Sequence, residues 1–172
     1  MKRVFALLAF TLTLCADRVP VTRAMLAERE RTLDRRFVGE VLDDNGFLLL
    51  GGTRGVYLDG FGAVFTVELN LVAGPAITPF RQQITEDDIK KVHLRKSDRM
   101  PQLKKTMRSM LLSTAEIMNA VPADENIVIG VSLLNLSWED TKGLPSQIVM
   151  RAPRKALLDK AQAEQAIVVK EF

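Results

Sequence analysis

The chain has 172 residues, of which 47% are hydrophobic and 26% charged, and its formal net charge is +3. A chain of this size and hydrophobicity buries enough surface to fold as one domain without disulfides or metal ions. It contains one cysteine and one histidine. This composition excludes disulfide scaffolds and zinc sites built from several cysteines.

The first residues have the order of charged and apolar side chains that is typical of a secretory signal peptide. Lys2 and Arg3 form a positive start, and the uncharged, mostly apolar segment 4–14 follows. That segment is shorter than the roughly 20 residues of a membrane-spanning helix. We therefore expect a signal peptide at 1–16, a single α+β domain at 17–172, and an exported protein, periplasmic or secreted. An uncleaved anchor and a buried N-terminal helix are the alternatives.

A lipid anchor on Cys15 is a less favoured alternative. Lipoprotein processing requires a small side chain just before the cysteine, and Leu14 occupies that position. Cleavage after Ala16 would lower Lys plus Arg from 24 to 22 against 21 acidic residues, leaving a net charge of +1. The mature chain would then have no cysteine nucleophile. Its balanced charge does not predict a nucleic acid partner.

The first predicted element is a helix over residues 20–44. Leu26, Leu33, Phe37 and Val41 recur at spacings of seven and four, which places them on one apolar stripe. Charges of both signs fill the other positions and predict a solvated outer surface, at Glu28, Arg29, Glu30, Arg31, Asp34, Arg35 and Arg36.

Three strands are predicted next, at 47–50, 56–58 and 63–72, joined as a meander or hairpin by turns rich in glycine. The third strand alternates apolar and polar residues, so one face is buried and the other is wet. The side chains expected to face the helices are Phe65, Val67, Leu69 and Leu71.

Thr85 is a predicted N-cap for a long helix, because three acidic residues follow it in the first turn. Pro101 predicts a kink in this helix or a break between two helices. Met107, Met110 and Met118 follow helical spacing. We interpret them as core residues, with an adaptable binding surface as the alternative.

The last third of the chain is expected to complete a sheet. Segment 127–136 is apolar on both sides of the alternation, which predicts a central strand covered on both faces. Strands at 146–152 and 166–172 flank a short helix that begins near Pro153. The fold class is thus α+β: an antiparallel or mixed sheet of about five or six strands, packed against an N-terminal helix, a long kinked central helix and a short C-terminal helix.

Half of the ten glycines lie between Gly51 and Gly62 and resemble a phosphate-binding loop at first sight. Such loops need a Walker lysine or a third glycine at a fixed spacing, followed by a helix. Neither is present, and strands follow. We therefore interpret these glycines as turns, and no cofactor is predicted.

Catalytic residues are not identified by any motif. The sequence contains no nucleophile-elbow motif that would supply a catalytic serine beside His93. We interpret His93 as a partly buried structural histidine. A carboxylate-dependent hydrolase using Asp59 or Glu68 with Glu139 or Asp140 remains an alternative, although no spacing places two of them together.

A run of positive residues is the clearest charge feature, with eight cations and one acid, Asp98, between positions 90 and 108. A solvated helix face is the simpler interpretation, and a peripheral contact with anionic membranes or another polyanion is the alternative. The run lacks aromatic residues for base stacking. The candidate contact residues are Lys90, Lys91, Arg95, Lys96, Arg99, Lys104, Lys105 and Arg108.

The block YLDGFGAVFTVELN, from Tyr57 to Asn70, resembles a segment of uncharacterised exported bacterial proteins. This resemblance covers about a tenth of the chain and implies export but no activity. We expect a non-enzymatic cell-envelope protein that binds an unknown protein partner or serves as an assembly module. Tyr57, Asp59 and Phe61, near the turn, are the residues proposed to contact that partner.

Overall fold

The computed structural model describes residues 19–39, 46–75, 83–159 and 161–172. The predicted α+β fold is confirmed, with a mixed sheet, an N-terminal helix, a long central helix and two short C-terminal helices. The elements in chain order are α1 (Arg23–Val38), β1 (Leu48–Leu49), β2 (Arg54–Leu58), β3 (Gly62–Asn70), α2 (Glu86–Ile117), β4 (Asn126–Leu133), β5 (Gln147–Pro153), α3 (Arg154–Leu158), α4 (Ala163–Ala166) and β6 (Val168–Glu171).

The sheet has the strand order β1-β3-β4-β5-β6, and β2 pairs with β3 along the same edge as β1. The central pair β3 and β4 is parallel, with Gly62 opposite Asn126, whereas the other pairs are antiparallel. A parallel pair needs a long crossover, which α2 provides. A side chain on Gly62 would collide with the backbone of Asn126, so only glycine fits at this junction.

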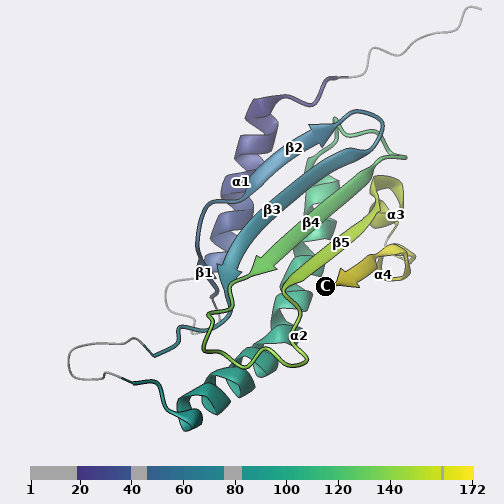
Figure 1. The fold of residues 1–172 in the computed structure, drawn as a ribbon. Coiled ribbons are helices and arrows are strands. Elements are labelled where there is room, and N and C mark those ends of the chain that lie inside the picture. Colours follow the sequence, from purple (N-terminus) through teal and green to yellow (C-terminus); the bar gives the residue numbers. More distant parts are fainter. Residues whose placement is uncertain (1–18, 40–45, 76–82, 160) are drawn as a thin grey trace, which may run out of the picture.

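Helices α1 and α2 cover one face of the sheet and leave the other face uncovered (Figure 1). On the covered side Phe65, Val67, Leu69 and Leu71 are buried, as predicted. The prediction that both faces of β4 are covered is corrected: α1 and α2 lie on one side only. Val128 on the other side is buried nonetheless, since β4 has a neighbouring strand on each side.

One cluster of buried side chains joins the sheet to the helices. Met107, Met110 and Met118 belong to it, which confirms their assignment to the core. Leu26, Leu33 and Phe37 of α1 also belong to it, which confirms the predicted stripe; Val41 lies outside the described residues.

Two charged residues of α1 correct the prediction of a solvated outer surface. Arg29 and Glu30 are only 2% and 8% exposed. Both are three or four residues from Leu26 and from Leu33, so the helical period places them on the same inward face as these leucines.

The central helix is continuous from Glu86 to Ile117, so of the two alternatives predicted at Pro101, a kink or a break, the break is excluded. Thr85 caps it as predicted, in a reciprocal pair of hydrogen bonds with Asp88. Proline removes only one ladder bond, and the buried neighbours Met100 and Leu103 hold the helix against the core. The helix changes direction along its length (Figure 1).

The predicted signal peptide at 1–16, including Cys15, lies outside the described residues. Within the described part of the chain, no helix has the length and hydrophobicity to span a bilayer.

Candidate functional site

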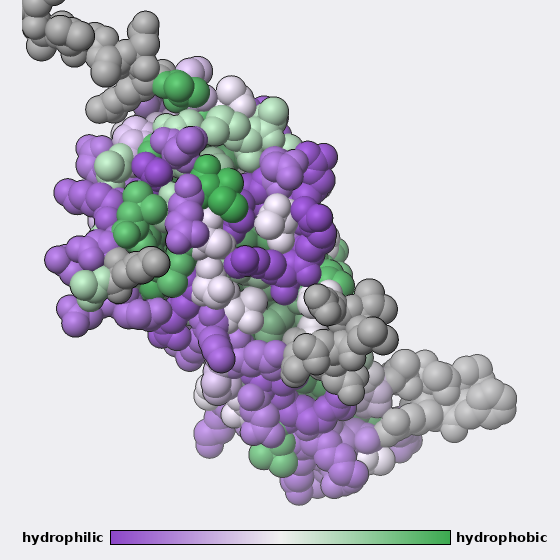
Figure 2. Space-filling model, turned by 180° about the vertical axis from the view of Figure 1, so that it is seen from behind, coloured by the Kyte–Doolittle hydropathy of each residue, from purple (hydrophilic) through white to green (hydrophobic). Residues whose placement is uncertain are grey.

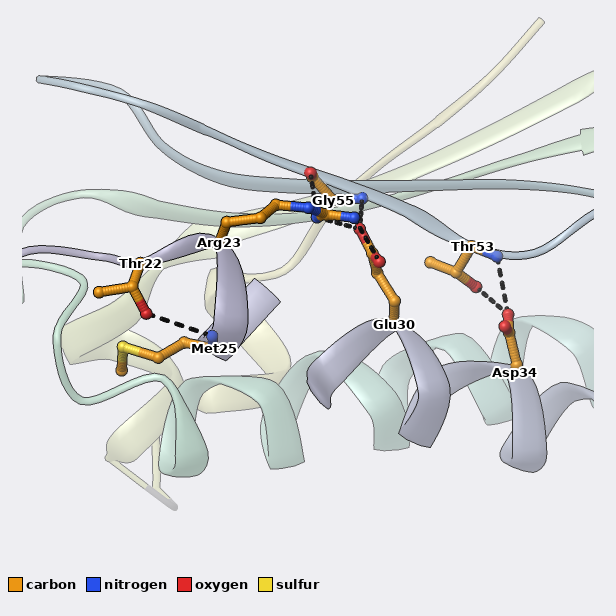
Figure 3. A network of polar contacts seen from close by, with 7 residues as sticks. All are labelled: Thr22, Arg23, Met25, Glu30, Asp34, Thr53 and Gly55. Atoms are coloured by element: carbon orange, nitrogen blue, oxygen red, sulfur yellow. Dashed lines mark hydrogen bonds and ion pairs between the residues drawn. The ribbon is translucent and has the colours of Figure 1, made fainter. Parts of the chain in front are cut away.

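The glycine-rich loop before β2 binds carboxylates of the protein itself. Thr53 donates its backbone N–H and its hydroxyl to Oδ1 of Asp34, at 2.7 and 2.6 Å. The N–H of Gly55 donates to Oε1 of Glu30 at 2.7 Å (Figure 3). These amides are the groups that a phosphate-binding loop would direct at a ligand. Here they attach α1 to the sheet.

The carboxylate of Glu30 also binds Arg23, with distances of 2.6 and 2.9 Å to the two terminal guanidinium nitrogens. The hydrogen bonds from Arg23 hold the pKa of Glu30 below its ordinary value, against the opposing effect of burial, and the Gly55 N–H adds to the lowering. Glu30 is therefore a structural ion.

The three residues proposed to contact a partner do not form one surface. Tyr57 is partly buried and packs against the core on the helix side. Asp59 and Phe61 are exposed in the β2–β3 turn. The turn is attached to the sheet, since Asn126 donates its backbone N–H to the carbonyl of Phe61 at 2.8 Å.

The uncovered face of the sheet carries an apolar row that the sequence analysis missed. Register places Val56, Val64 and Val128 side by side, followed by Arg151 and Val168. Val56 and Val168, at its ends, are 48% and 45% exposed. We call Val56, Val64, Val128 and Val168 the valine row. The alternation along β3 predicts a solvent-exposed face on this side of the sheet. The valines come together only through the register between strands, which the sequence does not show.

The basic run does not form a continuous surface. Lys104 pairs with Glu171 at 2.6 Å and Arg108 with Glu164 at 3.8 Å, so both bind the C-terminal segment. Lys91 pairs with Asp87 on its own helix at 2.5 Å. The positions that remain exposed and enter no ion pair with the described residues are Lys90, Arg95 and Lys105.

Two further members of the run point into the protein. The guanidinium of Arg99 lies 4.9 Å from the centre of the Phe47 ring and donates to the carbonyl of Gly46 at 2.6 Å. Lys96 is 2% exposed, which corrects its assignment to an anionic contact surface. Val92, Lys96 and Met100 are spaced four residues apart and are all buried, so Lys96 lies on the inward stripe of α2.

Lys96 forms a buried ion pair with Glu139, whose side chain is equally inaccessible. Its ammonium group also donates to the carbonyl of Leu134 at 2.8 Å and to Oδ1 of Asn135 at 3.1 Å. All three donors of the ammonium group are thus used. The Glu139 carboxylate therefore binds Lys96 in the protein interior, whereas Asp59 lies in the exposed β2–β3 turn.

His93 is half-buried, and its Nδ1 lies 2.9 Å from the carbonyl oxygen of Asp140. This contact matches the predicted structural role. In the described ranges no three His, Cys, Asp or Glu side chains come close enough together to hold a metal ion.

A second buried cation, Arg29, lies in the contact between α1 and α2. Its Nε donates to Oγ1 of Thr114 at 2.8 Å, and its Nη2 donates to Oγ of Ser113 at 2.7 Å and to the carbonyl of Met110 at 3.2 Å. Its Nη1 is buried and has no hydrogen-bond partner in the described part of the chain. Every partner of this guanidinium is neutral.

Arg36 lies about two helical turns after Arg29 on α1. It donates to the same Ser113 hydroxyl at 3.0 Å. Burial, and secondarily the charge of Arg36, lower the pKa of Arg29 to about 10. Arg29 is still charged at neutral pH. Of the described acidic residues, none forms an ion pair with Arg29 or Arg36. The two arginines therefore make a site of uncompensated positive charge at the contact between α1 and α2. Figure 2 shows the molecule from the side on which these two helices lie.

No family model, curated protein or solved structure matches this chain. The resemblance of the 57–70 segment to uncharacterised exported bacterial proteins therefore remains an expectation.

Proposed function

We propose that the chain is an exported, non-enzymatic module that binds a protein partner through the uncovered face of its sheet. The observation that carries this proposal is the valine row, which crosses the sheet from β2 to β6. A sheet face turned to water normally carries polar side chains. An apolar row at this place is typical of a surface that another molecule covers.

The surroundings of the valine row favour a protein as the covering molecule. Arg54, Arg151 and Lys170 are exposed and lie on the same face by register. Protein interfaces combine an apolar centre with a polar rim, and arginine is enriched in them. Leu58 also belongs to this face and is half exposed.

The surroundings of the two candidate catalytic carboxylates, Glu139 and Asp59, favour a binding function over hydrolysis. Glu139 is held by Lys96, and Asp59 lies in the exposed β2–β3 turn. An inaccessible carboxylate bound to a lysine is poorly suited to act with an exposed one on the same bond.

The test is co-purification of the tagged full chain from its own cells, with Val56→Lys as the disrupting variant. A charge within the apolar valine row should weaken partner retention at least about tenfold. Leu158→Lys, also at an exposed apolar residue but on α3, is the matched control and should retain the partner. Equal retention by both variants, or a partner-free monomer from the unmodified chain, would refute the proposal.

Export is tested separately by cell fractionation and by the intact mass of the recovered chain. We expect a chain that lacks residues 1–16. A diacylglycerol adduct on Cys15 would instead identify a lipid-anchored protein.

A further inference from the structure

A hollow of about 400 Å³ lies between α1 and α2 and combines an apolar wall with one buried cation. Ala24, Met25, Ile117 and Met118 supply the apolar wall, and Arg29 lines the same hollow. This volume lies within the range of small-ligand sites, which are mostly apolar with a few placed polar groups.

Arg29 is held rigidly but is not neutralised. Its hydrogen bonds to Thr114, Ser113 and Met110 fix the guanidinium against α2. A buried charge is costly unless an opposite charge accompanies it. Arg36 adds a second positive charge to this neighbourhood and increases the attraction for an anion.

The hydrogen-bond partners of Arg29 do not depend on it. Thr114 donates its hydroxyl to the carbonyl of Met110 at 2.6 Å, and Ser113 donates to the same carbonyl at 3.1 Å. A purely structural arginine would be expected to satisfy groups that otherwise have no partner. Here the unmet requirement belongs to Nη1 of Arg29 itself.

We propose that this hollow binds a free fatty acid, an aliphatic monocarboxylate, with its carboxylate on Nη1 of Arg29 and its chain along Met25, Ile117 and Met118. A carboxylate accepts hydrogen bonds from a guanidinium at short distance and neutralises it. The aliphatic chain covers Ile117, which is 57% exposed. Nη1 is buried, so the headgroup reaches it by displacing part of the lining, and methionine side chains adapt to such shifts at low cost.

A monoanion fits this site better than a phosphate. Glu28 also lines the hollow, and its carboxylate, paired with Arg31 at 2.8 Å, would repel a second negative charge. The unpartnered Nη1 of Arg29 carries two N–H donors, which the oxygens of a single carboxylate can accept.

The experiment is calorimetric titration of the purified, delipidated full chain with sodium dodecanoate below its micelle concentration. Dodecan-1-ol tests the chain without the charge, and acetate and inorganic phosphate test the charge without the chain. We expect dodecanoate to bind at least about tenfold more tightly than each of them, since the alcohol lacks the charge-assisted pair and the small anions lack the apolar contact.

Arg29→Met should weaken dodecanoate binding at least about tenfold, and Ile117→Glu should do the same by opposing the chain. Arg35→Met is the matched control, because Arg35 lies exposed on the same helix and does not line the hollow. Its binding should match that of the unmodified chain.

Three results would overturn the proposal. They are unchanged binding by Arg29→Met, equal binding of dodecan-1-ol and dodecanoate, and binding of a peptide with a C-terminal leucine carboxylate by a protein that does not bind dodecanoate. The last result would assign the site to a protein terminus. Should Arg29→Met fail to fold, the comparison of dodecanoate with dodecan-1-ol on the unmodified chain decides alone.

Discussion

Lys96 and Arg29 are two cations buried to the same extent, each 2% exposed, in opposite electrostatic situations. Lys96 binds the Glu139 carboxylate and two further oxygens, which use every proton of its ammonium group. Arg29 binds only neutral oxygens, and its Nη1 has no partner among the described residues.

The two cations thus differ in charge compensation: an acidic residue of the fold neutralises Lys96, whereas the proposed ligand would neutralise Arg29. Lys96 connects α2 to the segment that follows β4, so its neutralisation is built into the chain. The positive charge of Arg29 has no such partner in the described protein. Substitutions at the two positions should therefore change stability in opposite directions.

The largest effect is expected from Lys96→Met. Removing one member of a buried ion pair leaves the other charge uncompensated, so the free energy of unfolding should fall by about 3–5 kcal/mol. Urea denaturation measures it. Lys91→Met is the control, because Lys91 and Asp87 form an exposed pair on the same helix and such pairs contribute about 1 kcal/mol or less.

Adding Glu139→Leu to Lys96→Met should recover most of that loss, since an apolar pair replaces a buried ion pair at little cost. If the double variant is no more stable than the single one, uncompensated charge is not the cause of the loss.

Glu30→Gln should have an intermediate effect, because Glu30 is buried while its partner Arg23 is 61% exposed. Solvent screens this pair, and the amide oxygen can still accept from Gly55, so the expected loss is about 1 kcal/mol. Glu28→Gln, in an exposed pair with Arg31, is the control in the same denaturation experiment and should change little. Equal losses for the two variants would contradict the structural role of Glu30.

The contribution of Glu30 should also depend on pH. Its pKa is lower in the folded protein than in the unfolded chain, so it stabilises the fold above its unfolded pKa, near 4.5. As the pH falls through the lower, folded pKa this stabilisation is lost. The difference in unfolding free energy between the unmodified chain and Glu30→Gln should therefore be constant above about pH 6 and decrease below about pH 4. A difference that grows in acid would contradict this sign.

The smallest change, of opposite sign, is expected from Arg29→Met. Removing an uncompensated buried charge offsets the loss of its three hydrogen bonds, so stability should be unchanged or rise by about 1 kcal/mol. Because the pKa of Arg29 is lowered to about 10, any advantage of the variant should shrink as the pH rises past that value. A loss of more than about 2 kcal/mol at neutral pH would make Arg29 a structural residue and remove the contrast with Lys96.

The sequence predicted the fold class because hydrophobic periodicity reports burial directly. The same periodicity contained a signal for both buried cations. Arg29 lies between Leu26 and Leu33 on one stripe, and Lys96 lies four residues from both Val92 and Met100. Interpreting charged residues as solvated by default concealed that signal.

Other features could not be obtained from local pattern. Glu139 lies 43 residues from Lys96, so only the folded chain brings these charges together. The valine row depends on register between strands, and the parallel pairing of β3 with β4 depends on the path of α2. The sequence did not decide between a kink and a break at Pro101, because propensity takes no account of the core that holds α2 in place.

The parallel pairing of β3 with β4 has a consequence for how the protein is made. Gly62 and Asn126 are paired although they are 64 residues apart. At about 5–20 residues per second, synthesis reaches β4 roughly 3–13 s after it reaches β3. During that interval helix α1 has already been made, but β3 has no neighbour along the edge that β4 later occupies. An unpaired strand edge is prone to association with other chains, so β2–β3 is a segment in need of protection by a chaperone. Crosslinking of stalled nascent chains that end before and after β4 would reveal this protection, which should be lost once β4 is available.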